Sequence, residues 1–166
     1  MKKSIKYLSF LSLIILSLAS FGQEKVVSTL NIKNGLVYEI NQQQPYTGKF
    51  ISKYKDGHNK EEINYKNGKK DGLIVLWYEN GQKRVEGNYK NNKKEGLAVL
   101  WYENGQKLAE GNYKNDKLEG LFVSWHENGQ KKVEGIFKNN EPTGDEKCWN
   151  KKGELIKCDK ELDWSR

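Results

Sequence analysis

The side chains that most often carry out enzyme chemistry are few in this sequence and stand apart from one another. The two histidines, His58 and His126, fall in different segments, and neither has a serine or cysteine at a motif spacing. The glycines never precede a Lys-Ser or Lys-Thr pair that opens a helix, so no phosphate-binding loop is predicted. We therefore expect no catalytic residue, no cofactor and no metal site.

Carboxylates recur instead at a regular spacing. Glu79 is repeated at Glu103, and Glu86 is repeated at Glu110. A catalytic pair needs two carboxylates made different by their surroundings, whereas the same residue in every unit favours pairing with lysine or arginine across strands. The pattern indicates a protein that is not an enzyme.

Two cysteines, Cys148 and Cys158, lie near the end of the chain. Their spacing lacks the two-residue gap of thioredoxin-like motifs, and no histidine cluster accompanies them, so a redox centre and a zinc site are disfavoured. We predict a disulfide that closes a short loop and stabilises the terminal unit by about 2–3 kcal/mol.

The N-terminal segment, residues 1–22, predicts export. A cationic start is followed by an apolar run over residues 7–21 and by Gly22. The run has about 15 residues, fewer than the ~20 that span a bilayer, so we expect a helical signal peptide cleaved near Gly22. No cysteine follows the run to accept a lipid. The mature protein is expected in the periplasm or outside the cell.

Net charge argues against a nucleic-acid binder. The sequence holds 29 basic and 22 acidic residues, a formal charge of +7. Removal of Lys2, Lys3 and Lys6 with the signal peptide leaves 26 against 22, or +4. Such a small excess, mixed with acids throughout, is typical of a solvated surface. We expect no nucleic acid among the partners.

A 24-residue unit organises the rest of the chain. It starts at Gly72 and returns at Gly96 and Gly120, with degenerate copies at Gly48 and Gly144. Equal spacing without insertions is the signature of a repeat architecture in which each unit packs on its neighbours. The expected parts are the signal peptide 1–22, an N-terminal lead-in or cap 23–47, a repeat array 48–158 and a C-terminal tail 159–166.

Each unit is predicted to be one β-hairpin. Hydrophobic residues alternate from Leu73 to Trp77, Asn80–Gly81 is a strong hairpin signal, and a second strand follows. A polar turn beginning at Asn91 leads into the next unit, because asparagine tolerates left-handed conformations. The expected fold is all-β: a single twisted antiparallel meander sheet of stacked 24-residue β-hairpin repeats, preceded by the signal-peptide helix. In the lead-in, short strands are expected at residues 26–27 and 36–40.

The spacing also predicts how side chains divide between two faces. If Trp77 and Val85 share a face, the parity of paired positions requires a loop of three or five residues, most simply a type I turn with Gly81 in a left-handed bulge. We expect that face to be the core, with a carbohydrate- or base-stacking platform as the alternative. Its members would be Trp77, Trp101, Trp125, Trp149, Tyr65, Tyr89, Tyr113 and Phe137, with Gly87, Gly111 and Gly135 leaving room for an indole.

The opposite face is the first candidate for partner binding, and both cysteines are expected on it. Its apolar side chains form a stripe that is either an exposed interaction surface or is buried by sheet curvature, and the pattern leaves both open. The candidate interaction face consists of Ile74, Leu76, Tyr78, Ala98, Leu100, Tyr102 and Phe122.

A ridge of lysines in the turns between units is the second candidate surface. Acids such as Asp71 and Glu95 dilute it, so one interpretation is solvated turns and the other is contact with an anionic lipid or glycan surface. The candidate ridge consists of Lys66, Lys69, Lys70, Lys90, Lys93, Lys94, Lys114 and Lys117.

These units resemble a known family. Residues 77–81 (Trp-Tyr-Glu-Asn-Gly) and 86–89 (Glu-Gly-Asn-Tyr), restated from Trp101 and Trp125, are similar to the bacterial variant of the MORN repeat. The resemblance covers about residues 35–158. It implies a twisted meander sheet and a role in protein–protein contact or membrane-surface association.

The terminal units depart from the family pattern. Lys53 replaces tryptophan in the first unit, and the last unit lacks the Tyr-Glu-Asn sequence, so both are expected to be caps. Some bacterial relatives are catalogued as candidate toxin-neutralising proteins, a role that fits an exported protein poorly because its target would lie in the cytoplasm. The expected partner is a protein of unknown identity, with an anionic lipid or glycan surface as the alternative.

Overall fold

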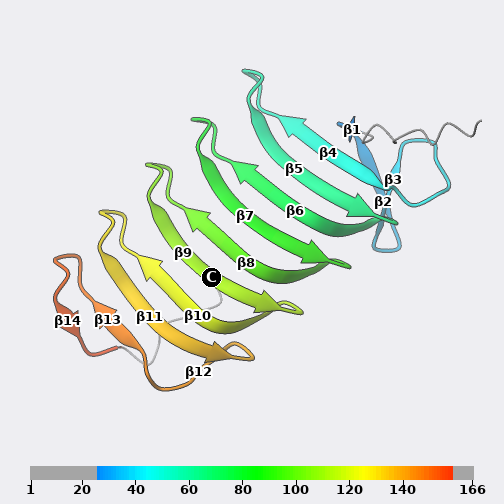
Figure 1. Cartoon of the computed structure of the whole chain (residues 1–166). Coiled ribbons are helices and arrows are strands. Elements are labelled where there is room, and N and C mark those ends of the chain that lie inside the picture. The colour runs from blue at the N-terminus through cyan, green and yellow to red at the C-terminus, as the bar shows by residue number, and fades with distance from the viewer. Residues whose placement is uncertain (1–25, 159–166) are drawn as a thin grey trace, which may run out of the picture.

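The computed structural model describes residues 26–158, and that part of the chain is all-β. One sheet of twelve strands holds every described strand except β2 and β3, which form a separate pair. Figure 1 shows the long strands side by side in chain order, as one curved layer. The predicted meander of stacked hairpins is therefore confirmed. The predicted signal-peptide helix in residues 1–22 lies outside the described residues.

Eight long strands form the body of the sheet, each antiparallel to the next. They are β4 Gly48–Lys53, β5 Asn59–Lys66, β6 Lys69–Trp77, β7 Lys83–Lys90, β8 Lys93–Trp101, β9 Lys107–Lys114, β10 Lys117–Trp125 and β11 Lys131–Lys138. Short strands lie at the two ends: β1 Val26–Val27, β2 Leu30–Lys33, β3 Leu36–Glu39, β12 Glu141–Pro142, β13 Lys147–Trp149 and β14 Leu155–Ile156. Strand β1 pairs parallel to β4, and β2 was not predicted.

Three-residue loops close the hairpins at one edge of the curved layer, which we call the loop rim. The Gly81 N–H donates to the Tyr78 carbonyl at 3.0 Å, and the Tyr78 N–H donates to the Gln82 carbonyl at 2.9 Å. Gly81 has a φ of 81°, the left-handed conformation that a side chain would strain. The predicted turn with a glycine bulge is confirmed.

Two-residue turns join the hairpins at the opposite edge, which we call the turn rim. Asn91 and Asn92 have φ values of 51° and 70°, and the flanking residues Lys90 and Lys93 pair directly. Positive φ at both central positions defines the type I′ turn, whose twist matches that of the strands. The predicted left-handed asparagines are confirmed.

A second bulge, just inside the loop rim, overturns the predicted register. Leu76 pairs with Val85, but Trp77 pairs with Lys83, so Arg84 is an extra residue in β7. A slip of one residue moves every later side chain to the other face of a strand. The loop was predicted correctly, and the bulge next to it reverses the conclusion drawn from it. The equivalent extra residues are Lys60, Leu108 and Lys132.

The recurring tryptophans and the recurring tyrosines consequently lie on opposite faces of the sheet. The prediction that they share one aromatic face is wrong. The face with the tyrosines, which we call the glycine face, has a central row that alternates glycine with larger residues. This row is Ile74, Gly87, Ala98, Gly111, Phe122 and Gly135. The face with the tryptophans, which we call the leucine face, carries Leu73, Leu97, Leu121 and Ile136.

The glycine face holds the tightest packing in the described part of the chain. Phe137 is 1 % exposed and meets the Phe122 ring edge-on, with ring centroids 5.5 Å apart. A Cβ atom on Gly111 would lie 2.6 Å from Leu118 Cδ1. The glycines therefore make room for neighbours such as Leu118, and the predicted indole partner is wrong.

The two ends of the array are closed by different means. At the first end, Gly68 accepts a hydrogen bond from Val37 and donates one to Tyr46, so the lead-in wraps the first two-residue turn. At the last end, Cys148 and Cys158 form a disulfide with a Cα–Cα distance of 5.3 Å. Cys148 pairs with Val133 on the glycine face.

Candidate binding surfaces

Two members of the predicted interaction stripe are buried in the structure. Ile74 is 4 % exposed and Ala98 is 9 % exposed, and the other members of the stripe are half-buried. Bulges recur in the central hairpins and bend the strands that carry them, and Figure 1 shows the sheet as a curved layer. Ile74 and Ala98 are therefore corrected from surface to core, whereas the other members of the stripe lie between the two alternatives that the sequence left open.

The aromatic residues at the loop-rim end of that stripe have a structural partner. The Tyr78 hydroxyl donates to the Trp101 carbonyl at 2.7 Å, and the Tyr102 hydroxyl donates to the Trp125 carbonyl at 2.9 Å. Each bond links one repeat to the next. The recurrence of tyrosine at this position therefore reflects stacking of the array.

The largest apolar side chains that stay exposed along the central strands lie on the other face. Leu97 is 49 % exposed and Leu121 is 48 % exposed, and the paired Ile136 is 44 % exposed. Leu73 continues the row at 39 %. The sequence signal was present, because a leucine follows the first glycine of three units, but the parity argument assigned that position to the core.

Exposed lysines border the same face at the turn rim. Lys90 pairs directly with Lys93, and by strand alternation both lie on the leucine face, so two like charges stand opposite each other. Within residues 26–158, no carboxylate forms an ion pair with any of these lysines. Like charges directly opposite are destabilising in a sheet. The three opposed pairs are Lys66 with Lys69, Lys90 with Lys93, and Lys114 with Lys117.

The acids that dilute the ridge in the sequence hold the turns in place. Glu95 accepts a hydrogen bond from the backbone N–H of Asn115 at 3.0 Å, and Asp71 accepts one from Asn91 at 3.3 Å. Because these carboxylates bind backbone groups, they leave the charge of the opposed lysines uncompensated by ion pairs.

Two members of the predicted ridge do not belong to it. The Lys70 ammonium lies 5.5 Å from the centroid of the Tyr89 ring, and the Lys94 ammonium lies 4.9 Å from that of Tyr113. Both lysines are half-buried on the glycine face, where cation–π contact holds them.

Lysines at the loop rim are also partnered. The Lys107 ammonium lies 2.6 Å from a Glu110 carboxylate oxygen and 5.5 Å from the centroid of the Trp125 ring. Lys83 makes the same contacts with Glu86 and Trp101. Glu86 and Glu110 therefore pair with the lysine three residues before them in the same strand, and pairing across strands, as predicted, is seen for Glu62 with Lys49. Glu79 and Glu103 form no ion pair within residues 26–158. The rings are covered by lysine, which disfavours an open stacking platform.

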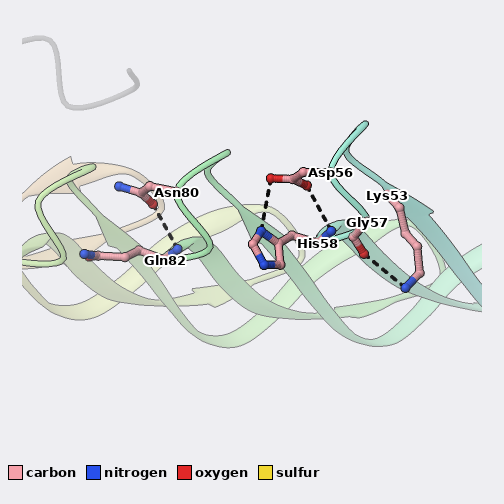
Figure 2. Close-up of polar contacts among 6 residues, drawn as sticks. All are labelled: Lys53, Asp56, Gly57, His58, Asn80 and Gln82. Atoms are coloured by element: carbon pink, nitrogen blue, oxygen red, sulfur yellow. Dashed lines mark hydrogen bonds and ion pairs between the residues drawn. The ribbon is translucent and has the colours of Figure 1, made fainter.

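His58 contacts its own loop, and His126 contacts the next repeat. His58 Nδ1 lies 3.1 Å from an Asp56 carboxylate oxygen, and the His58 backbone N–H, 3.0 Å from the other oxygen, lowers the pKa of Asp56 (Figure 2). The same loop shows Lys53 donating to the Gly57 carbonyl. His126 Nε2 lies 2.8 Å from the Trp149 carbonyl, in the position that Tyr78 occupies in its own repeat.

Half-buried tyrosines of the glycine face have raised pKa values. Burial raises the pKa of Tyr113, and it raises the pKa of Tyr89 together with the nearby charge of Asp116. Burial likewise raises the pKa of Tyr65, with a further contribution from Glu61. These phenols are thus held in the neutral form at and above the pH at which a free tyrosine ionises.

Comparison with known protein families finds a match for the central repeats. The model described as the MORN repeat variant matches residues 70–91, 94–115 and 118–139, one segment for each hairpin from β6 to β11. No curated protein matches the sequence. Among the described residues, no group of histidine, cysteine, aspartate or glutamate could hold a metal ion, and no helix is long and apolar enough to cross a membrane.

Proposed function

Residues 70–139 of this chain are MORN variant repeats, a non-catalytic kind of binding repeat, and we propose that the chain is an exported module that docks a protein partner through its leucine face. The observation that carries the proposal is the row of exposed leucines, which recurs at one position in three successive repeats. Exposed apolar rows of this kind are typical of interaction surfaces.

Export is supported by the signal-peptide pattern of residues 1–22, which lie outside the described part of the chain. The disulfide between Cys148 and Cys158 supports it independently, because such bonds persist in oxidising compartments. The compartment in the proposal is the periplasm or the cell exterior.

The test is affinity purification with two charge variants that differ in position. Leu97→Lys with Leu121→Lys places charge in the exposed row, and Glu103→Lys with Glu127→Lys places charge on the exposed loop rim. We expect partner chains to be recovered with the wild type and the loop-rim variant and to be lost with the leucine variant. Circular dichroism should be unchanged in both variants. Full recovery with the folded leucine variant would contradict the proposal.

The opposed lysine pairs favour a second candidate, a binder of anionic lipid or glycan surfaces. A basic residue close to the membrane surface contributes about 1 kcal/mol of attraction to an anionic leaflet. Six lysines without an ion pair on one face would therefore be sufficient for attachment. Sedimentation with vesicles of phosphatidylserine and phosphatidylcholine tests it. Replacing Lys90, Lys93, Lys114 and Lys117 with glutamine should release the protein, whereas replacing the ion-paired Lys83 and Lys107 should not.

The same measurement separates the two candidates. Electrostatic attachment must weaken as salt rises, because exposed charges are screened over about 10 Å at 0.1 M. Attachment to vesicles without the anionic lipid, or attachment insensitive to salt, would rule out the second candidate and leave the protein partner.

A further inference from the structure

The last repeat carries a pocket of about 340 Å³. Its lining includes the buried side chains of Val133 and Cys148, the half-buried Trp149 and the exposed Ile156. The volume lies at the lower end of the ~300–1,000 Å³ that is usual for binding pockets. An apolar side chain of moderate size fits such a site.

The pocket also has basic walls. Lys132, Lys151 and Lys157 line it, and all three are exposed. Within the described chain, none of the three forms an ion pair with a carboxylate. The site therefore combines an apolar lining with three unpaired cations, which suits a ligand that carries carboxylates beside an apolar anchor.

The last strand of the array leaves apolar side chains exposed. Strand β14 is the last in the sheet order, and its residues Leu155 and Ile156 are 68 % and 48 % exposed. Terminal repeats of a stacked array need a cap, since no further repeat covers their apolar side. At the first end the lead-in supplies that cover around Gly68.

We propose that this pocket is a binding site for an acidic peptide segment with an apolar anchor, and that its occupant is the chain's own tail, residues 159–166. In an extended segment successive side chains point to opposite sides. The tail places its three acidic residues at alternate positions, and its two large apolar residues share the other set of positions with Lys160 and Arg166, so three acidic side chains stand against two basic ones. The carboxylates are Asp159, Glu161 and Asp163, and the apolar residues are Leu162 and Trp164.

The disulfide brings the tail to the site. Cys158 is bonded to Cys148, which lines the pocket, and their Cα atoms are 5.3 Å apart. Six extended residues span roughly 20 Å, so Trp164 can reach any part of the lining. A tethered segment acts at an effective concentration on the order of millimolar, so even weak complementarity fills the site.

Hydrogen exchange of residues 147–157 tests the proposal in the full chain. In the variant Leu162→Ala with Trp164→Ala, we expect these amides to exchange at least tenfold faster than in the wild type. The matched control is Ser165→Ala, which should leave exchange unchanged. Exchange elsewhere in the sheet, and the thermal transition of β4 to β11, should be the same in all three proteins.

A synthetic peptide with the sequence of residues 159–166 provides the second measurement. Added to the Leu162→Ala, Trp164→Ala chain, it should restore slow exchange, and a scrambled peptide of the same composition should not. Replacing Lys132 and Lys151 with glutamate should weaken binding of the peptide at least tenfold. Equal exchange in wild type and variant, or equal action of the scrambled peptide, would overturn the proposal. Protection that rises with protein concentration would also overturn it, because the occupant would then be a second copy.

Discussion

The two faces of the sheet carry the same 24-residue period but differ in what surrounds each recurring side chain. On the glycine face, Ile74 and Ala98 are buried, and the Lys94 ammonium lies over a tyrosine ring. On the leucine face, Leu97 is half exposed and Lys90 stands opposite another lysine. Both patterns recur equally well in the sequence.

The difference teaches that recurrence alone does not identify a functional residue in a repeat protein. A residue that recurs on the glycine face has a neighbour in the next repeat that explains it, as the hydrogen bond from Tyr78 to Trp101 does. Of the opposed lysines, only Lys117 has a side-chain hydrogen bond of this kind within the described residues, to Asn139 of the next two-residue turn, and the leucine row stays partly exposed. The lysine pairs oppose folding. Residues that recur without stabilising the fold are therefore the better candidates for partner binding.

The largest expected contrast between the faces comes from truncating one large side chain on each. Phe137→Ala removes a ring that is 1 % exposed and should lower the free energy of unfolding by about 3–5 kcal/mol. Leu121→Ala removes a side chain that is 48 % exposed and should change it by only about 0.5 kcal/mol. Urea denaturation of both variants measures the difference. Val75, Val99 and Val123 are already buried on the leucine face, and equal losses would show that the exposed row of Leu121 belongs to that core as well.

A glycine replacement tests how closely the glycine face is packed. Gly111→Ala places a Cβ atom 2.6 Å from Leu118 Cδ1, and Leu118 is only 3 % exposed and has little room to move. We expect a loss of about 1–3 kcal/mol from overpacking. The control is Gly135→Ala, whose nearest neighbour is Glu146 Cγ at 3.0 Å, in a side chain that can shift. A smaller loss at Gly111 than at Gly135 would contradict the assigned packing.

Alkaline pH should destabilise the glycine face selectively. Burial raises the pKa of Tyr89 and Tyr113 above the ordinary value of 10.0, so folding favours the neutral phenols. The resulting stability is present below pH 10.0 and is lost as pH rises through the folded-state pKa values. The midpoint of thermal unfolding should fall above that pH, and Tyr113→Phe should make the fall shallower. An unchanged slope in this variant would refute the explanation.

The smallest expected effect has the opposite sign. Lys93→Glu converts the like-charged pair with Lys90 into an attractive one and should raise stability by about 0.2–1 kcal/mol. The last hairpin already has this arrangement, because Lys138 pairs with Glu141. Partner or vesicle binding should weaken in the same variant. A stability gain without loss of binding would show that the opposed lysines have no part in recognition.

Prediction from sequence succeeded for features that depend on residues close together in the chain. The asparagine and glycine residues specify both turn types, because few other residues adopt positive φ without strain. The fixed period specifies the stacking order of the hairpins. The disulfide partners followed from there being two cysteines in one terminal unit.

Prediction failed at the second bulge. Arg84 occupies a position that is filled by Leu108 and Lys132 in the next two repeats, so residue type gives no signal there. Because one residue was not counted, the second strand of each hairpin was assigned to the wrong face relative to the first strand, and the candidate surface was assigned wrongly with it. Six of the eight lysines of the candidate ridge are exposed at the turn rim, because charge and distance from a turn are readable without the register, whereas Lys70 and Lys94 are half-buried over tyrosine rings.

The sequence by itself determined a repeating all-β chain with hairpins of fixed length, left-handed turn residues and a terminal cysteine pair, because these depend on residues close together in the chain. Tertiary structure alone decided which side chains face which way. That choice depends on how a bulge accommodates strand pairing and curvature, where the relevant neighbours come from other strands. The surface open to a partner is thus set by the bulge beside each loop.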